Sequence, residues 1–599
     1  MVVPNIAERR RHFFTLNQED MGPDRESARK QLAHYILSGL QHAVYVMQGP
    51  QTKIPPLEED FNPIVVHLFE EGSTRTDVSN RVAEIRKGCH VMPLVVNMSS
   101  LIKGEVLEDT ADTLAGYQIS SLVLRTSTLG AARHIAHTTE ELEGPENWIY
   151  PGFSVISGGE GPLTHAQQVV LDLTTMFTED GFADKGIHIL NMDQWQELDK
   201  ALKSESTEAL LERICQFIDE LRICYVGDSK NSRIVSSAIH LAEYFDIHYL
   251  FVGPKQLRID EGSISHINAE PSDRLTDAMS WPRIYALRTQ LERLTGTPDA
   301  PGQMTERDAI ALIKEFLLGH DFLSAYDGKV YHARPRDGKH PMIPLEIKDQ
   351  RLYPGIRYMT QSFMGPPTRM GIFQTCHDSR HLKTTLIPAP SMDESNIIIH
   401  SDPSDTWNAH QTVLNGKYRD RPMTFMSIED GEAQDRLEDD RVGIHHQLNY
   451  ELGVYAGRKG PVSVHSGLWS VDREVYKGTI AIFGAYAPPL AAAIHGLVSP
   501  GVRFSIMKKT ELGPNGEGSY QRVEYPLPEF VEGFDCLEPR CITNRTGTAK
   551  CIHRVTGKKG EVDGDNWPKV GMECVSCETR NTAREVVMHK YGSLVRKIS

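Results

Sequence analysis

An apolar, strand-like run that ends in a group of phosphate-binding side chains constrains this chain more than any other feature. The run Ile64–Phe69 leads through a turn into Ser73–Thr76, which reads Ser-Thr-Arg-Thr, and residues 77–87 then have helical spacing. The apolar face expected for this helix comprises Val78, Val82 and Ile85. Backbone N–H groups and the helix dipole favour an anion at a helix start, and hydroxyl and guanidinium donors match a phosphate. The segment predicts a phosphate site, with a plain helix N-cap as the open alternative.

Five further segments place a cation, a hydroxyl or an imidazole beside an apolar run, as in the ligand sites of α/β proteins. They are Ser99–Glu105, Arg125–Ala132, His165–Gln168, Gly227–Arg233 and Arg288–Gln290. The pattern also predicts alternating elements, with a strand over 222–226, a helix over 234–245 and a strand over 248–252. Such alternation is typical of parallel sheets with right-handed crossovers.

With these six segments in this order, the chain resembles the catalytic chain of aspartate carbamoyltransferase over roughly residues 60–293. The family reads Ser-Thr-Arg-Thr, Ser-x-x-x-Lys-Gly-Glu, Arg-x-x-x-x-Gly-Ala-Ala, His-Pro-Thr-Gln, Gly-Asp-x-x-x-x-Arg and Arg-x-Gln. The fourth is a partial match, with Ala166 and Gln167 in place of Pro and Thr. The resemblance implies an α/β fold with two doubly wound parallel-sheet domains. It also implies carbamoyl transfer from carbamoyl phosphate to the amine of L-aspartate, a step of pyrimidine biosynthesis.

The resemblance implies a role for each residue of the substrate site. Those implied to act in catalysis are Arg75, Thr76, Lys103, Arg125 and His165. Those implied to bind substrate are Ser73, Thr74, Ser99, Gln168, Arg233, Arg288, Gln290, Ala389 and Pro390. Residues 73–76 would hold the phosphate, Arg125 and His165 (with Thr76) would polarise the carbonyl oxygen, and Gln168 would hold the carbamoyl amide.

On the aspartate side, the resemblance implies that Arg233 pairs with the α-carboxylate and that Arg288 and Gln290 take the β-carboxylate. The planar guanidinium of Arg288 offers two parallel hydrogen bonds and would repel the cationic side chain of ornithine. The loop with Ser99 and Lys103 would enter the site of a neighbouring subunit, which implies a homotrimer or a dimer of trimers with shared active sites.

One departure from the family leaves two alternatives open. Residues 387–391 read Ile-Pro-Ala-Pro-Ser, where the family has His-Pro-Leu-Pro-Arg. Pro390 would keep the family's rigid turn, whereas Ala389 and Ser391 replace the family's Leu and Arg. A carbamoyltransferase for another amino acid and a non-catalytic scaffold subunit therefore remain as alternatives.

Two closely spaced cysteine pairs near the C-terminus form a second candidate site. They read Cys536-x4-Cys541 and Cys574-x2-Cys577, and such pairs supply a tetrahedral thiolate set for structural Zn²⁺. A disulfide framework is the alternative, disfavoured in a reducing compartment. The spacing also resembles the zinc domain of the family's regulatory chain, which implies a catalytic–regulatory fusion. No organic cofactor is implied.

Net charge and hydropathy argue against two classes of protein, nucleic-acid binders and membrane-spanning proteins. The 599 residues carry a net charge of −16, which argues against a general nucleic-acid binder. No apolar run approaches the roughly 18 residues of a membrane span, and the N-terminus lacks a signal-peptide core. We expect a soluble, cytoplasmic protein of several domains.

The expected organisation has five parts. They are an N-terminal extension (1–55), a carbamoyl phosphate domain (56–182), an aspartate domain (183–460), a regulatory-like remnant (461–530) and a zinc-binding β domain (531–599). Within the aspartate domain we expect a surface insertion at about 294–385, rich in Gly, Pro and aromatic residues, and a helix through Tyr455 that crosses back to the first domain. The remnant is too short for a whole nucleotide-binding domain, so weak or absent ATP and CTP control is expected.

Overall fold

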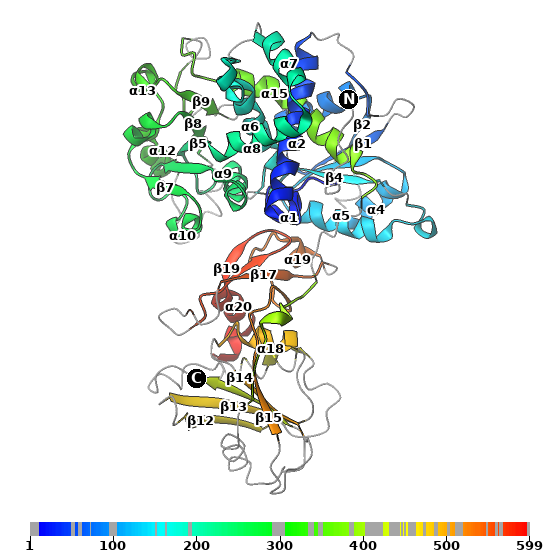
Figure 1. Cartoon of the computed structure of the whole chain (residues 1–599), viewed down its shortest axis with the longest axis vertical. Helices are drawn as coiled ribbons and strands as arrows, with labels where there is room; N and C mark the ends of the chain where they lie inside the picture. The colour runs from blue at the N-terminus through cyan, green and yellow to red at the C-terminus, as the bar shows by residue number, and fades with distance from the viewer. Residues whose placement is uncertain are drawn as a thin grey trace. The chain divides into compact units, whose positions relative to one another are not determined.

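The chain, seen in a computed structural model, divides into two compact units, residues 1–386 and 387–599 (Figure 1). The described residues are 11–48, 54–57, 63–71, 73–94, 105–149, 152–161, 164–189, 194–289, 306–332, 341–345, 352–382, 389–401, 423–429, 444, 447–448, 451–452, 463–470, 475–483, 489–499, 503–508, 519–546, 549–557, 561 and 567–595. Among them, no helix combines the length and the apolar character that a membrane crossing requires.

The first unit contains two parallel sheets, as predicted. The first sheet has the order β2-β1-β3-β4, and the second has the order β7-β6-β5-β8-β9. The first comprises β1 (Ile64–Phe69), β2 (His90–Leu94), β3 (Ser121–Thr126) and β4 (Ser154–Glu160). The second comprises β5 (Arg222–Gly227), β6 (His248–Val252), β7 (Ala269–Ser272), β8 (Arg283–Leu287) and β9 (Lys329–His332). Every pairing in both sheets is parallel, so the carboxyl ends of the strands in each sheet share one edge.

Helices cover these sheets. They are α1 (Gln18–Met21), α2 (Arg25–Met47), α3 (Thr74–Arg86), α4 (Leu107–Gly116), α5 (Ala131–Leu142), α6 (Ala166–Asp180), α7 (Trp195–Ser204), α8 (Thr207–Asp219), α9 (Arg233–Ile239), α10 (Glu261–Ile264), α12 (Glu306–Ile313), α13 (His320–Ala325) and α15 (Tyr358–Asp378). The 3₁₀ helices of the unit are η3 (Pro145–Asn147), η4 (Ala183–Lys185), η6 (His240–Glu243), η7 (Leu275–Ser280) and η8 (Lys314–Phe316). One buried cluster contains residues of both sheets and of α2 and α6, so a continuous apolar core supports the two domains of this unit.

The N-terminal segment belongs to this core. Phe13 forms a parallel bridge with Ile156 of β4, and its N–H and C=O groups bond to the neighbouring backbone at 3.1 and 2.7 Å. Asp24 then caps α2, because its side chain accepts the N–H of Ser27 at 2.8 Å. The described part of the expected extension is therefore an integral part of the first unit.

The segment expected to be a surface insertion instead supplies core structure. β9 pairs with β8 as the fifth strand of the second sheet, and Phe316, Leu323 and Val330 lie in the cluster under that sheet. The prediction for residues 294–385 is therefore wrong over the described part. Its Gly, Pro and aromatic content was misleading, because Pro366 and Pro367 lie inside helix α15 and several aromatic side chains, among them Phe316, Tyr331 and Phe373, are buried.

Helix α15 is the described element that returns to the first domain, whereas Tyr455, in the helix expected to cross back, lies outside the described residues. α15 packs against α2, α3 and α6. Glycines permit a close approach of the two backbones, since a Cβ on Gly371 would lie 2.4 Å from the backbone nitrogen of Gly39 in α2. The chain leaves the first unit soon afterwards, at Leu386, so the predicted domain 183–460 spans the division between the units.

The second unit begins with a six-stranded antiparallel sheet in the order β10-β15-β14-β11-β13-β12. Its strands are β10 (Ile398–Ser401), β11 (Met423–Glu429), β12 (Ser463–Ser470), β13 (Val475–Phe483), β14 (Arg503–Lys508) and β15 (Ser519–Glu524). The short helices η9 (Glu394–Asn396) and α18 (Pro489–His495) accompany it. We expected a short remnant limited to residues 461–530. That boundary is wrong, because β10 and β11 precede residue 461 and belong to the same six-stranded sheet.

A smaller antiparallel sheet follows, in the order β16-β17-β18-β19. Its elements are β16 (Phe530–Glu532), α19 (Ile542–Arg545), β17 (Ile552–Thr556), β18 (Gly571–Cys574), β19 (Arg580–Thr582) and α20 (Ala583–Val595). Val531, Met572 and Val587 are buried in a common apolar cluster, so α20 packs on this sheet. The predicted β domain at 531–599 thus corresponds to an antiparallel sheet with one covering helix.

Candidate active site and metal centre

Helix α3 begins at Thr74, three residues earlier than predicted, so the Ser-Thr-Arg-Thr segment forms its N-cap and first turn. The Ser73 carbonyl accepts the Asp77 N–H at 3.0 Å, but the Ser73 side chain makes no capping hydrogen bond. Thr74 and Arg75 are exposed, whereas Thr76 is buried. The hydroxyl of Ser73 is thus not used for capping, and the helix start presents donors to a ligand.

The apolar face predicted for α3 does not point into the core. Val78 is 51% exposed and Ile85 is 62% exposed. The buried face is polar instead: the ring of His67 on β1 contacts Asp77 at 2.8 Å and Glu84 at 2.6 Å. Hydrogen bonds to both ring nitrogens fix α3 over β1 and hence fix the position of the helix start.

Arg125 and His165 converge beside Gly159 at the carboxyl edge of the first sheet. Arg125 is buried and donates from Nη1 to the Gly158 carbonyl at 2.8 Å. Gly159 has φ +114°, and a Cβ there would lie 3.0 Å from Arg125 Nη1 and 3.6 Å from His165 Nδ1. A side chain at position 159 would therefore fill the space between the two groups.

His165 is held from both domains of the first unit. It caps α6, and its backbone N–H donates to Ser237 Oγ of α9 at 2.8 Å. Its buried ring nitrogen Nδ1 has no hydrogen-bond partner within the described part of the chain. Burial lowers the pKa of His165 well below its usual value, and four guanidiniums lower it further: Arg233, Arg125, Arg369 and Arg75. The imidazole is therefore neutral and can donate a hydrogen bond from one nitrogen.

Arginine side chains from both domains lie near the ends of the two sheets. Glu71 Oε2 lies 3.5 Å from Arg125 Nη2 and 3.6 Å from Arg233 Nη1, so one carboxylate links the two sheets' edges. Although the Arg75 side chain is exposed, desolvation by the surrounding protein lowers its pKa, and the guanidiniums of Arg125 and Arg288 lower it further. Because Arg125 and Arg233 both lie beside Glu71, these strand ends form a candidate site for anionic ligands.

The structure does not bring every predicted residue to this site. Ser99, Lys103 and Gln290 lie outside the described residues. Ala389 and Pro390 belong to the second unit, where the adjacent Ser391 pairs with Phe530. Their place in the substrate turn stays a prediction, although the chain has left the second sheet and passed through α15 before it reaches them.

The segment that follows β9 is the better match to the family's His-Pro-Leu-Pro-Arg turn. β9 ends at His332, and residues 332–336 read His-Ala-Arg-Pro-Arg, which shares the His, the second Pro and the Arg. Residues 333–336 lie outside the described part. The topology nevertheless starts this segment at the carboxyl edge of the second sheet, where α/β proteins bind ligands.

Two buried charged residues near the site were missed in the sequence. Arg369 on α15 is 4% exposed, and burial together with the neighbouring Arg75 lowers its pKa to about 10. Asp172 on α6 is 5% exposed, and burial raises its pKa to about 7. The spacing from Gln168 to Asp172 on one helix was a usable signal. Arg369 offered none, since it lies beyond the segments that carry the family resemblance.

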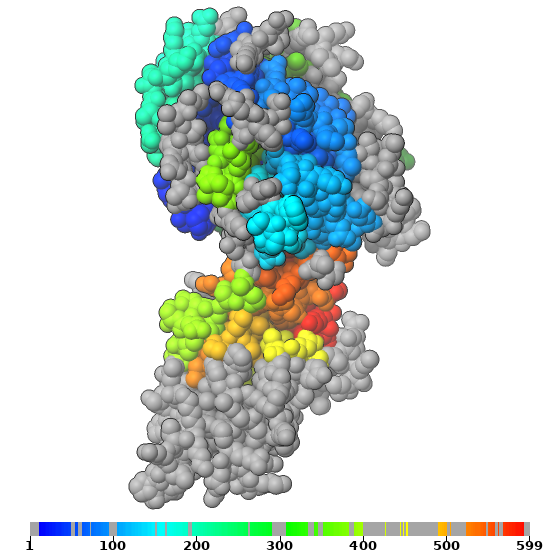
Figure 2. Space-filling view, turned by 90° about the vertical axis from the view of Figure 1, so that its right-hand side faces the viewer, coloured from blue at the N-terminus to red at the C-terminus, as the bar shows by residue number. Residues whose placement is uncertain are grey.

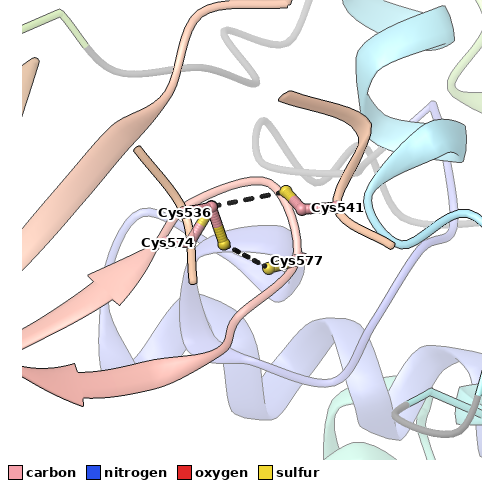
Figure 3. A group of neighbouring side chains, drawn as sticks. All are labelled: Cys536, Cys541, Cys574 and Cys577. Carbon is pink, nitrogen blue, oxygen red and sulfur yellow. Dashed lines mark hydrogen bonds between the residues drawn. The ribbon is translucent and has the colours of Figure 1, made fainter. Parts of the chain in front are cut away.

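The four cysteines predicted as a metal site do come together. Their sulfur atoms all lie within 4.8 Å of one another and all four side chains are buried (Figure 3). Cys536 Sγ is 3.5 Å from Cys577 Sγ, and Cys541 Sγ is 3.8 Å from Cys574 Sγ. Tetrahedral Zn²⁺ with Zn–S bonds of about 2.3 Å separates its sulfur ligands by about 3.8 Å. The cluster can hold a metal ion of this kind.

Neighbouring groups suit thiolate ligands. Thr543 Oγ1 donates to Cys541 Sγ at 3.2 Å, and Thr579 Oγ1 lies 3.2 Å from Cys577 Sγ. Such contacts orient metal-bound sulfur atoms and stabilise their charge. Cys551 is not part of the four-sulfur group and lies 3.8 Å from His553 Nδ1 instead.

The chain is similar in sequence to known carbamoyltransferases. A family model described as "Aspartate/ornithine carbamoyltransferase, carbamoyl-P binding domain" matches residues 29–178. The aspartate carbamoyltransferase catalytic subunit of Archaeoglobus fulgidus is 30% identical over 344 residues, 57% of this chain and 93% of that protein. The catalytic subunit from Methanocaldococcus jannaschii is 28% identical over 329 residues, 53% of this chain and 86% of that protein. A solved structure of the M. jannaschii catalytic subunit aligns with a TM-score of 0.43 at 25% identity, over 62% of this chain and 99% of that one.

The parallel sheets and the cationic site at their edges define a carbamoyltransferase-type α/β protein. The chain belongs to the family of aspartate carbamoyltransferase catalytic subunits, as its sequence resemblance predicted.

Proposed function

We propose that the first unit transfers the carbamoyl group of carbamoyl phosphate to the amine of L-aspartate, giving N-carbamoyl-L-aspartate and phosphate. The observation that carries this proposal is the convergence of Arg125 and a neutral His165 beside Gly159, within reach of the α3 start. Family membership and the names of the relatives support aspartate as the acceptor. Such a product is a precursor for pyrimidine biosynthesis.

The start of α3 would bind the phosphate. The residues that would hold it are Ser73, Thr74, Arg75 and Thr76. Their backbone N–H groups, hydroxyls and guanidinium match a dianion that must be stabilised further as it leaves. The Ser73 hydroxyl makes no capping hydrogen bond and is therefore available to a ligand, which supports this role.

Arg125 and His165 would stabilise negative charge on the carbonyl oxygen during attack, together with Thr76. The aspartate nitrogen forms a bond to the carbonyl carbon with its lone pair, the bond from that carbon to the phosphate oxygen breaks, and the departing phosphate accepts the amine proton. Gln168 would accept a hydrogen bond from the carbamoyl amino group. Positioning and electrostatic stabilisation therefore supply most of the catalysis.

The second domain would bind aspartate. We assign the α-carboxylate to Arg233, which already faces Glu71, and the β-carboxylate to Arg288 and Gln290. The segment 332–336 takes over the role expected of Ala389 and Pro390, because it starts where β9 ends. Initial rates of phosphate release with aspartate, ornithine and a panel of other amino acids test this assignment. Turnover with aspartate alone supports this assignment. Turnover with a different amino acid would show that this amino acid is the acceptor and would contradict the assignment.

A neutral His165 predicts a distinctive pH profile. Replacing His165 with Ala should lower kcat about 10²-fold, because one donor to the developing oxyanion is lost. The pH profile between about pH 6 and 9 should keep its shape, because the imidazole is already uncharged at and above its usual pKa of about 6.5. The check is kcat against pH for both proteins. An acid limb present in the wild type and absent from His165→Ala would contradict a neutral imidazole.

We further propose a homotrimer, or a dimer of trimers, whose sites are completed by Ser99 and Lys103 of a neighbouring subunit. Support comes from large exposed apolar side chains beside the site: Val78 and Ile85 on α3 and Met92, 56% exposed, on β2. Residues of the first domain, coloured blue to cyan, form a large part of one face of the first unit (Figure 2). Burial of such residues against another copy would explain their exposure in a single chain.

Mixing inactive subunits tests shared sites. Arg75→Ala and Lys103→Ala should each abolish most activity in a pure oligomer, because each removes a cation from every site. Unfolded and refolded together at equal amounts, they should regain a substantial part of wild-type activity, since some sites then receive both intact residues. A mixture of Arg75→Ala with Thr76→Ala is the control. Both substitutions change the part of the site that a single subunit supplies, so mixing cannot restore an intact site. Equal activity in the two mixtures would refute sharing.

For the second unit we propose structural Zn²⁺ held by Cys536, Cys541, Cys574 and Cys577, with no organic cofactor in the protein. None of the nine cysteines forms a disulfide, which supports residence in the reducing cytoplasm. The antiparallel sheet and zinc domain together support a fusion of a catalytic chain with a regulatory-like unit.

A further inference from the structure

A buried carboxylate contacts Gln168, the residue proposed to hold the carbamoyl amino group. Asp172 is on α6, one turn after Gln168, and its side chain makes no ion pair with any described residue. Its Oδ1 atom accepts two amide hydrogen bonds, from Gln168 Nε2 at 2.9 Å and from Gln361 Nε2 at 2.8 Å. The carboxylate therefore acts as a common acceptor for two glutamine side chains from different helices.

The orientation of Gln361 is fixed independently. Its Oε1 atom accepts the backbone N–H of His332 at 2.9 Å, so its Nε2 must face Asp172. His332 is the last residue of β9 and begins the segment 332–336. A chain of hydrogen bonds thus runs from the edge of the second sheet through α15 to Asp172 in α6.

This arrangement determines which end of the Gln168 amide faces a ligand. The two ends of a carboxamide have nearly the same shape, so hydrogen-bond partners decide their orientation. Because Nε2 of Gln168 donates to Asp172, the Oε1 atom is directed away from it. Across the described residues, none donates a hydrogen bond to that oxygen. An acceptor is therefore presented to the site, and the matching ligand group is a donor.

We propose that Asp172 is a positioning residue that sets the Gln168 amide so that its Oε1 accepts a hydrogen bond from the amino group of carbamoyl phosphate, and thereby selects carbamoyl over acyl phosphates. The inference rests on the proposed carbamoyl transfer and identifies what makes the donor subsite specific. Acetyl phosphate has nearly the same size but carries a methyl group in place of the amino group, so it leaves the Oε1 acceptor without a donor.

A purely structural role accounts poorly for a carboxylate at this position. Burial raises the pKa of Asp172 to about 7, against the opposing effects of its hydrogen bonds and of Arg75. Tyr285 of β8 is the other polar neighbour that influences it. A buried carboxylate that lacks an ion pair is costly to the fold, and such groups are concentrated in functional sites.

The test uses two stable phosphonates that differ in one group. Phosphonoacetamide carries the amide NH₂, and phosphonoacetone carries a methyl group there. Dissociation constants for both are measured by calorimetry with the full-length wild type and with Asp172→Leu, which removes the acceptor at similar volume. Asp172→Asn keeps an Oδ1 acceptor and serves as the conservative variant. Thr178→Val is the matched control, because it removes a buried hydrogen bond to Thr174 elsewhere on α6.

The wild type should bind the amide at least about tenfold more tightly than the ketone, the usual effect of one buried hydrogen bond to a ligand. This ratio should fall to within about threefold of unity in Asp172→Leu and remain in Asp172→Asn and Thr178→Val. Where Asp172→Leu does not fold, Asp172→Ala removes the same acceptor without added bulk. In a Gln168→Ala background the Asp172→Leu change should have no further effect on the ratio, because the positioned group is gone.

Three results would overturn the inference. A wild-type ratio near unity would show that Gln168 does not accept from the amino group. An unchanged ratio in Asp172→Leu, with both ligands weakened equally, would leave Asp172 a structural role and leave the proposed function intact. An Asp172→Asn variant that discriminates as poorly as the Leu variant would refute the acceptor argument. Failure of the wild type to bind either phosphonate would instead contradict the proposed function itself.

Discussion

Replacing Arg125 with Met is expected to lower kcat for carbamoyl transfer by about 10²–10³-fold, with a smaller effect on KM for aspartate. The guanidinium is buried at the end of β3 and held by the Gly158 carbonyl at 2.8 Å, so it is oriented before substrate binds. A donor fixed in this way stabilises charge on the carbonyl oxygen in the transition state without reorganisation. Methionine keeps most of the side-chain volume while it removes the charge.

The measurement is steady-state kinetics of Arg125→Met beside Arg274→Met. Arg274 is a matched control because its side chain is 73% exposed and, among the described residues, forms an ion pair with the nearby Asp277. The control should retain wild-type kcat, since surface ion pairs contribute little. Loss of less than about threefold in Arg125→Met would remove Arg125 from the catalytic groups.

The second large effect concerns the cysteine cluster. Cys574→Ser should abolish stoichiometric zinc binding and remove the cooperative unfolding transition of the C-terminal β domain, because structural zinc supplies much of the folding free energy of a small domain. Cys574 is fully buried at the end of β18, where its sulfur faces Cys541 at 3.8 Å. Serine oxygen is a poorer zinc ligand than thiolate, and one lost ligand opens the tetrahedral set.

Cys551→Ser tests whether the loss of any cysteine, rather than the loss of a zinc ligand, causes these effects. The Cys551 thiol lies near the cluster but outside the four-sulfur group, so the variant should retain about one zinc per chain and the same unfolding transition. Zinc content by mass spectrometry of metals and thermal unfolding of the full chain provide the readouts. Equal zinc loss in both variants would show that the ligand set is wrong.

Short local patterns in the sequence carried most of the correct predictions. Within the described residues, five of the six segments lie where the alternation of strands and helices placed them, at the ends of β1, β3, β5 and β8 and at the starts of α3, α6 and α9. The strands predicted at 222–226 and 248–252 are β5 and β6, almost residue for residue. The cysteine spacing likewise predicted a cluster that tertiary structure then formed. In each case the chemistry depends on neighbours within a few residues of one another.

The errors arose where distant parts of the chain decide the outcome. The α3 face was mispredicted because His67, ten residues before Asp77, makes a polar face the buried one. The turn at 387–391 matched a proline pattern, but only topology shows that β9, ending at His332, is the last strand of the second sheet. Likewise, β10 and β11 complete a sheet whose other strands lie far downstream, since Ile398 of β10 pairs with Glu524 of β15.

Buried polar side chains were the hardest to predict. Asp172 and Arg369 look like ordinary helical residues in the sequence, and only the fold shows that both are buried near Arg75. Their importance depends on which helices surround them, which a local pattern cannot encode. Sequence reasoning therefore found the groups expected to contact substrate and missed the groups that hold those in place.

The central claim is that the chain is a working carbamoyltransferase for aspartate. The most direct test incubates the full-length protein with ¹³C-carbamoyl phosphate and L-aspartate and follows both products by NMR. We expect N-carbamoyl-aspartate and phosphate to form in equal amounts, and we expect Arg75→Ala to form neither product. A folded protein that releases no phosphate, or releases phosphate without carbamoylated aspartate, would contradict the central claim.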